Sequence, residues 1–388
     1  VVMIMIDKMF TYLLFIFHFF IFPSCFQSLG SLMPKEIAEW AIKEFEEQEK
    51  RKAHFNVKGL DRRTSLPFIT GDGFRAFCSH ICEDHNRCRM TPEDVKDGQA
   101  IFVKSDFMEF FANYVTSRIN ASYIVISHNG DLSAPDGQTD APRIGMSKYI
   151  GSDSLSLEYQ KKRLIAHHGQ NLWWRNVTIG SPRPEFSHCL PIGLENRYNP
   201  VGKNLQGYAD ALKQFVINGH SWKDEERPLL LIAFYPKSRV PDRGKVLNIL
   251  GAYNKRAATD PAPWFNHTDL THWQWLQAVT YHKFVLAPFG HGLDTHRIQE
   301  ILLMGGIPVM RRSTISSCYD DSDNTLHGKT RGSLPVVVLD KWEDLTKKRL
   351  EEEWERIKKI PITQWDWSRV FIYHWLERIF GKMPPQIT

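Results

Sequence analysis

The sequence has little net charge and lacks the short signatures of several common enzyme classes. Its 49 Lys and Arg residues nearly balance 44 Asp and Glu residues, so the formal charge is only +5. This excess is too small for 388 residues to support a nucleic-acid partner, which would require clustered basic residues. No G-x-S-x-G, Walker A or H-E-x-x-H motif is present, so the sequence does not indicate a nucleophile elbow, a P-loop or a zinc-protease helix.

The composition also lacks the biases of collagen-like, disordered and multi-span membrane proteins. Apolar residues make up 42% of the chain and charged residues 24%, with 24 Gly and 21 Pro. These values are those of an ordinary globular protein. At about 150 residues per domain, the length predicts two domains.

The N-terminal segment is the one long apolar run. Residues Phe10–Phe26 read FTYLLFIFHFFIFPSCF and follow a single basic residue, Lys8. This run is short for a span of about 20 residues and suits either the core of a signal peptide or a short membrane anchor. Residues 1–30 therefore predict entry into the secretory pathway, with a lumenal body in the Golgi or endoplasmic reticulum, or secretion if the segment is cleaved. Glycosylation sequons at Asn120, Asn176 and Asn266 are consistent with that route.

Cysteines are few and odd in number once Cys25 in the N-terminal segment is set aside. The remaining five are Cys78, Cys82, Cys88, Cys189 and Cys318, which allow at most two disulfides and one free thiol. The stretch from Cys78 to Cys88 also contains His80 and His85. A local disulfide, unpaired structural cysteines and a zinc site all remain open for it, although its spacing is not the usual one for zinc.

Strand-like and helix-like segments alternate along the body. Short apolar runs typical of buried parallel strands lie at 100–104, 123–127, 164–174, 190–197, 229–234, 284–288, 307–310 and 335–339. Helical spacing of apolar residues marks 34–54, 106–119, 243–256, 272–282, 295–306 and 342–359.

This alternation occurs twice, with a polar, glycine-bearing boundary around 200–228. It predicts an α/β protein with two Rossmann-like domains whose parallel sheets face a cleft. We expect a helical stem over 31–58, a first domain over 59–215, a second domain over 216–345, and C-terminal helices over 346–388 that pack back on the body. Ligands of such sheets bind at the C-terminal ends of the strands.

The segment that follows the strand-like run 284–288 is the most informative for chemistry. It contains Gly290 and Gly292, then Asp294 or Thr295 as the cap of a helix whose first turns carry Arg297 and Glu300. Glycines allow close backbone approach to a phosphate, the helix start attracts anions, and an arginine adds a forked donor. Glu300 lies one turn beyond Arg297 and can accept both hydroxyls of a ribose. The alternative is a surface ion pair between Arg297 and Glu300, which contributes only a few tenths of a kcal/mol.

Several segments together resemble a known family. FGHGLDTHRIQEILLMGGIPVM (289–310), followed by LPVVVLDKWEDL (334–345), resembles the C-terminal motif of exostosin-like glycosyltransferases of the GT-B type. ITGDGFRAF (69–77), YIVISHNGD (123–131) and segments within 170–197 resemble a related group of sugar transferases. The similarity covers about residues 65–345. The chain departs from the usual pattern at His291, where Asn is more common, and at Gln299, where Trp is more common.

The resemblance implies a role for each domain. The second domain would bind a nucleotide-sugar donor, with Glu300 on the ribose and with Arg297 and Arg243 near the diphosphate. The first would hold a glycan or glycoprotein acceptor, with His128 or Asp131 as the base that takes the proton of the acceptor hydroxyl. Asn171 and Glu195 are weaker candidates, and His167 and His168 are expected to be structural.

The resemblance also implies an inverting transfer that needs no cofactor beyond the donor. Asp321-Ser-Asp323 matches the metal-binding Asp-x-Asp pattern of the GT-A class, but it lies in a polar loop with no strand before it, so we expect no metal there. The alternative function is a catalytically inactive GT-B scaffold that binds glycans or a partner protein.

Overall fold

The computed structural model describes most of the chain outside its N-terminal segment. The described residues are 31–51, 54–57, 60–63, 65–83, 88, 90–131, 133–136, 152–174, 184–196, 204–219, 227–234, 241–251, 264–267, 269–320 and 333–381. The expected signal or anchor (1–30), the sequon at Asn176 and the pair Asp321 and Asp323 lie outside these residues. None of the described helices is long and apolar enough to cross a membrane.

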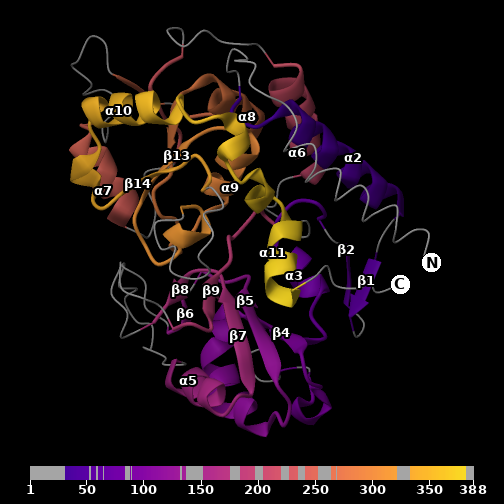
Figure 1. Cartoon of the computed structure of the whole chain (residues 1–388). Helices are drawn as coiled ribbons and strands as arrows, with labels where there is room; N and C mark the ends of the chain where they lie inside the picture. Colours follow the sequence, from indigo (N-terminus) through magenta and orange to yellow (C-terminus); the bar gives the residue numbers. More distant parts are fainter. Residues whose placement is uncertain are drawn as a thin grey trace.

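Two five-stranded parallel sheets organise the molecule (Figure 1). The first has the order β3-β4-β5-β7-β9 and lies in the lower part of Figure 1. Its strands are β3 (His80–Cys82), β4 (Gln99–Lys104), β5 (Tyr123–His128), β7 (Leu164–Gly169) and β9 (Ser187–Cys189). Strand β5 is buried along its whole length, which explains why its sequence YIVISH lacks polar alternation.

The second sheet has the order β11-β10-β12-β13-β14 and lies in the upper part of Figure 1. Its strands are β10 (Leu230–Ile232), β11 (Phe265–His267), β12 (Phe284–Leu286), β13 (Pro308–Arg311) and β14 (Val337–Leu339). Every strand pair of both sheets is parallel. The predicted mixed α/β class with parallel sheets is therefore confirmed. We call the parts built on these sheets the first and second halves.

Helices connect the strands of the second half at the predicted places. They are α7 (Pro241–Ile249), α8 (His272–Tyr281) and α9 (His296–Leu303). Helix α8 begins with a capping box, in which the Thr271 hydroxyl accepts from the Gln274 backbone N–H. Helices α3 (Gly71–Ala76), α5 (Ser152–Gln160) and α6 (Leu205–Ala211) complete the main layers.

Three sequence predictions of secondary structure were wrong in detail. Residues 190–196 form a loop, because Gly193 has φ +73 and the Leu194 N–H bonds the Ile69 carbonyl outside the sheet. The expected helix over 342–359 is split into a short 3₁₀ turn and α10 (Lys347–Ile357), because the Thr346 hydroxyl caps a new helix. Between β4 and β5, the helical segment alternates short 3₁₀, α and π turns.

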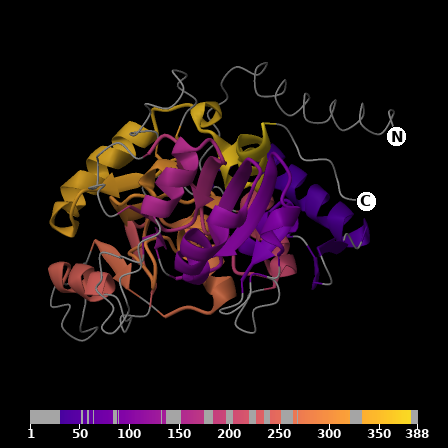
Figure 2. The same ribbon diagram turned by 90° about the horizontal axis from the view of Figure 1, so that it is seen from below.

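The expected stem helix belongs to the packed body. Helix α2 (Lys35–Arg51) buries Ile37, Ala41 and Phe45, and just before it the Leu32 N–H bonds the Gly305 carbonyl at 3.0 Å. Figure 2 shows α2 and α10 at opposite sides of the molecule. A solvated spacer would not bury apolar residues in this way, so the first part of the segment is part of the fold.

Helix α11 (Ile372–Phe380) brings the C-terminal region back to the first half. Its Ile372 N–H donates to the Pro67 carbonyl at 3.0 Å, and Phe371 forms a bridge with Phe68. Trp375 and Leu376 are buried on its inner face. Helix α11 lies within 346–388, where the sequence predicted C-terminal helices.

Among the cysteines that the structure describes, four form two disulfides and Cys78 remains a buried thiol. Cys82–Cys88 is the local disulfide that was one of the open alternatives. Cys189–Cys318 closes 129 residues of chain and joins the end of β9 in the first half to the 3₁₀ turn Ser316–Cys318 in the second. The halves are thus linked covalently, which the sequence did not predict.

Loss of the long-range disulfide should cost more stability than loss of the local one. The closed loops span 129 and 6 residues, so the double variant Cys189→Ser/Cys318→Ser should lose about 2–3 kcal/mol more unfolding free energy than Cys82→Ser/Cys88→Ser. Denaturant unfolding of both double variants measures this difference. An equal loss would mean that Cys189–Cys318 does not constrain the unfolded chain.

Candidate functional site

The two halves meet at a pair of polar residues, Asn171 and Asp294. The Asp294 backbone N–H donates to the Asn171 side-chain oxygen at 2.8 Å. The Asp294 carboxylate accepts from the Ile192 N–H of the first half and from the Tyr319 hydroxyl, both at 2.8 Å. Burial raises the pKa of Asp294 to about 6, although these hydrogen bonds oppose the shift. We call this contact the junction.

Gly292 and Asp294, which the sequence predicted to bind the donor, therefore contribute to the junction. The Asp294 carboxylate accepts a further hydrogen bond from the backbone N–H of its neighbour Thr295 at 2.8 Å. Gly292 is needed because a Cβ there would lie 2.3 Å from the Asn171 amide nitrogen. Asp294 is also not the N-cap of α9, since Thr295 takes that position. Asn171, a weaker cleft candidate, proves to be a structural partner of both.

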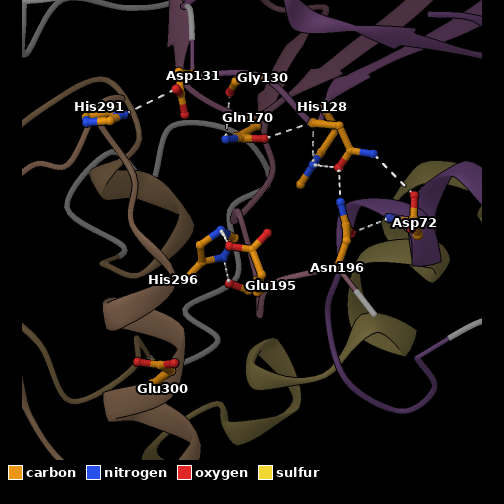
Figure 3. Close-up of polar contacts among 12 residues, drawn as sticks. Asp72, His128, Gly130, Asp131, Gln170, Glu195, Asn196, His291, His296 and Glu300 are labelled. Atoms are coloured by element: carbon orange, nitrogen blue, oxygen red, sulfur yellow. Dashed lines mark hydrogen bonds and ion pairs between the residues drawn. The ribbon is translucent and has the colours of Figure 1, made fainter. Parts of the chain in front are cut away.

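On the first half, helix α3 and the loops after β5 and β9 share one hydrogen-bond network (Figure 3). The Asn196 amide donates to the Asn129 side-chain oxygen at 2.9 Å, and its own oxygen accepts from the Asp72 backbone N–H at 2.9 Å. Asn129 has φ 59, a left-handed conformation that asparagine tolerates. The network fixes the loops after β5 and β9 relative to α3, and so places Asp131 and Glu195, which belong to those loops.

His128, one of the two predicted bases, lies inside the protein at the end of β5. Its Nδ1 accepts from the Asn129 backbone N–H at 2.9 Å, and its Nε2 faces the Pro191 carbonyl at 3.2 Å. Burial lowers the pKa of His128 to about 4. With 1% of its surface exposed and both ring nitrogens engaged, it is a weaker candidate for the base than Asp131. His167 and His168 are buried, as expected of structural histidines.

Two carboxylates of the first half face histidines of the second (Figure 3). Asp131 Oδ2 lies 3.4 Å from His291 Nδ1, and both side chains are about half exposed. Glu195 Oε2 lies 3.2 Å from His296 Nε2, with 21% and 32% of the side chains exposed. Both pairs therefore bring partly exposed ionisable groups of the two halves together.

The predicted arginines gather beside the start of α9. Arg243, on α7, donates from Nε to the Phe289 carbonyl at 3.3 Å, and Arg297 donates to the Ala233 carbonyl at 2.7 Å. Both guanidinium groups lie 5.8 Å from the Phe234 ring centroid. Burial lowers the pKa of Arg297 to about 10, with Glu300 opposing the shift and Arg243 adding to it.

The glycine-bearing loop that follows β12 lies beside Arg243 and the start of α9. Gly290 is buried, and a Cβ on it would lie 2.9 Å from the Thr295 methyl carbon and 3.7 Å from an Arg243 guanidinium nitrogen. The buried hydroxyl of Thr295 has no hydrogen-bond partner. Two cations, an uncapped helix start and an unpaired hydroxyl therefore lie together, which is a favourable arrangement for an anion.

Glu300 is more deeply buried than a ribose-binding residue was expected to be. It is 3% exposed, and its carboxylate accepts from the Tyr208 hydroxyl at 2.7 Å and from the Trp275 indole at 2.8 Å. His272 Nε2 lies 3.3 Å from the same carboxylate. Trp275 in turn stacks on Arg297 at 4.4 Å from the ring centroid. Glu300 therefore orients the aromatic platform of Arg297, and contact with a ribose would require Tyr208 or His272 to move.

Sequence reasoning missed the partners that make these groups a site. His296 was overlooked between Thr295 and Arg297, and Tyr208 gave no local signal because it is 92 residues from Glu300. His291 was noted only as a departure from the family pattern. Among the described residues, no group of three or more His, Cys, Asp or Glu is arranged to hold a metal ion.

Replacing Asp294 by Asn should weaken the junction in a pH-dependent way. The amide cannot accept all three hydrogen bonds, so we expect a loss of about 2 kcal/mol in unfolding free energy at about pH 5. The raised pKa of Asp294 gives a stability term that is fully present below the unfolded pKa and is lost as pH rises through about 6. The deficit of Asp294→Asn relative to wild type should therefore be smaller at about pH 8.

Denaturant unfolding at the two pH values measures this deficit. Asp131→Asn is the matched control, because the Asp131 side chain is 57% exposed and its loss should cost less than about 0.5 kcal/mol. Equal deficits at both pH values would contradict the assignment of a raised pKa to Asp294.

Comparison with known proteins adds no family to this geometry, because no protein-family model and no curated protein sequence matches the chain. The resemblance to exostosin-like glycosyltransferases therefore rests on the motifs quoted above. The function has to be argued from the groups at the junction.

Proposed function

We propose that the protein is a glycosyltransferase of the secretory pathway that transfers a sugar from a nucleotide-sugar to a glycan or glycoprotein, with inversion. In this proposal the first half holds the acceptor and the second half the donor. The halves correspond to the two domains of a GT-B enzyme, over about residues 59–215 and 216–345. Two parallel sheets, one in each half, support this arrangement.

One observation carries the proposal: the second half holds a cationic site, and carboxylates of the first half contact histidines that flank it in sequence. Arg243, Arg297 and the unpaired Thr295 hydroxyl lie on the second half. Asp131 and Glu195 of the first half each reach an imidazole of the second. A glycosyl transfer needs this polarity, because an anionic leaving group must be stabilised on one side while a base works on the other.

The chemistry assigns a step to each side. The acceptor oxygen attacks the anomeric carbon, the bond from that carbon to the diphosphate oxygen breaks, and its electron pair stays on the diphosphate. The acceptor proton passes to the Asp131 carboxylate, whose side chain is 57% exposed. The cations beside Thr295 stabilise the negative charge that develops on the leaving group. No metal is required in this scheme.

A catalytically inactive scaffold that binds glycans or a partner protein is the second candidate. The burial of Glu300 favours it, because a carboxylate held by Tyr208 and Trp275 has to be released before it can contact a ribose. Binding without turnover distinguishes the scaffold from the enzyme.

Arg297 should contribute to donor binding. Arg297→Ala should weaken the binding of UDP- or GDP-sugars by about 10–100-fold, because a charge-assisted contact to a phosphate is lost. The affinity of Arg297→Lys should lie between those of wild type and Arg297→Ala. Titration calorimetry measures both, with circular dichroism to verify folding. Arg118→Ala is the control, since Arg118 is exposed on the first half. If wild type binds neither class of donor, and Glu300→Ala changes nothing, the donor site is disproved.

Asp131 should act in turnover and leave donor binding unchanged. Asp131→Asn keeps the size of the side chain but cannot accept a proton, so we expect kcat to fall by about 10²–10⁴-fold at an unaltered donor Kd. Product formation from acceptor glycans and calorimetry with the donor separate the two effects. A normal kcat in Asp131→Asn would remove Asp131 as the base.

A further inference from the structure

Asn120, the asparagine of a glycosylation sequon, lies on the first half at the end opposite to the junction. It is exposed, and it precedes β5, which runs from Tyr123 to His128. Strand β5 pairs in parallel with β7, and the junction residue Asn171 follows the C-terminal end of β7. At about 3.3 Å per residue, the start of β5 lies roughly 16 Å from its C-terminal end. Asn120 is therefore remote from the groups that the proposed transfer uses.

The backbone on both sides of Asn120 is held by hydrogen bonds, whereas its side chain is not. The Ile119 carbonyl accepts from the Arg163 guanidinium at 3.2 Å. The backbone N–H and the hydroxyl of Ser122 both donate to the Asp97 carboxylate at 2.8 Å. Among the residues that the structure describes, none forms a hydrogen bond with the Asn120 side chain. Its amide nitrogen is therefore open to modification without the loss of any of these contacts.

Asn266, the asparagine of the other described sequon, differs in what its amide nitrogen contacts. Although the residue is exposed, its Nδ2 lies 2.9 Å from His282 Nε2, and His282 is only 4% exposed. His282 Nδ1 donates to the Ala278 carbonyl at 2.7 Å, so Nε2 is the nitrogen that accepts from Asn266. A glycan on Asn266 Nδ2 would have to lie against this buried ring. The fold therefore favours a glycan at Asn120 over one at Asn266.

The disulfides support the same modification independently of the sequons. Cys82–Cys88 and Cys189–Cys318 are bonds that form and persist in oxidising compartments such as the lumen of the endoplasmic reticulum. N-linked glycans are added to Asn-x-Ser/Thr sequences of proteins that pass through this compartment, and they occupy surface positions.

We propose that Asn120 carries an N-linked glycan and that Asn266 does not. The cell's oligosaccharyltransferase supplies the glycan from a lipid diphosphate-linked oligosaccharide. The Asn120 amide nitrogen bonds to the anomeric carbon, the bond from that carbon to the diphosphate oxygen breaks, and its electron pair stays on the diphosphate. The amide nitrogen gives up one proton to a base of the transferase. This inference rests on the secretory route in the proposed function, and it is independent of the catalytic activity.

The test is glycan mapping by mass spectrometry on the full chain produced in eukaryotic cells. Peptide N-glycosidase converts a glycosylated asparagine to aspartate, and we expect this conversion at Asn120 and not at Asn266. Asn120→Gln and Ser122→Ala should each abolish it, because each removes the sequon. Asn266→Gln is the matched control and should leave the glycan map unchanged. Mapping by peptide also separates Asn120 from the sequon at Asn176.

A second preparation carries a cleavable secretion signal ahead of the full chain, which delivers it to the lumen whatever its own N-terminal segment does. An unmodified Asn120 in both preparations, or a glycan on Asn266, overturns the inference and leaves the proposed function standing. If Asn120 is modified only with the added signal, the N-terminal segment does not direct entry. The inference and the secretory part of the proposed function then fail together.

Discussion

The buried contact between Asp294 and the first half is the interaction on which the rest of the site depends. Its carboxylate receives the Ile192 N–H from one side and the Tyr319 hydroxyl from the other, while its backbone N–H reaches Asn171. A buried carboxylate is tolerated only where donors surround it, so these groups must stay close together in the folded chain. The Cys189–Cys318 disulfide links the same two halves covalently. Each half therefore presents its side chains to the other in a fixed arrangement.

The positive and the negative side chains that the proposed reaction needs lie on different halves. Positive groups gather at the start of α9 because parallel strands and the helices that follow them place loop residues at one edge of the sheet. The aromatic rings of Phe234 and Trp275 stabilise these positive charges, because the guanidinium groups lie over the ring faces. The carboxylates Asp131 and Glu195 lie on the first half, in the loops that the network around Asn129 and Asn196 holds. The proposed transfer uses this separation directly.

The short-range features of the chain were predictable because they depend on neighbouring residues. The apolar runs of β5 and β12 and the amphipathic spacing of α9 follow from local periodicity. The loop at 190–196 was mistaken for a strand because LPIGL is apolar, whereas its burial comes from packing against Ile69, 125 residues earlier than Leu194. Asp294 and Gly292 were assigned to a ligand for the same reason, since their partner Asn171 is distant in sequence.

By itself, the sequence determined the α/β class, the parallel strands and the residues that cluster near α9, because hydrophobic period and glycine placement are local properties. Only the tertiary structure decided which of those residues remain accessible to a ligand. It buried His128, Glu300 and Asp294 among protein partners, and it brought Glu195 to His296 across the junction. Burial and long-range pairing arise from contacts between segments that are distant in sequence, such as Tyr208 with Glu300 and Ile192 with Asp294, and no local pattern in the sequence encodes them.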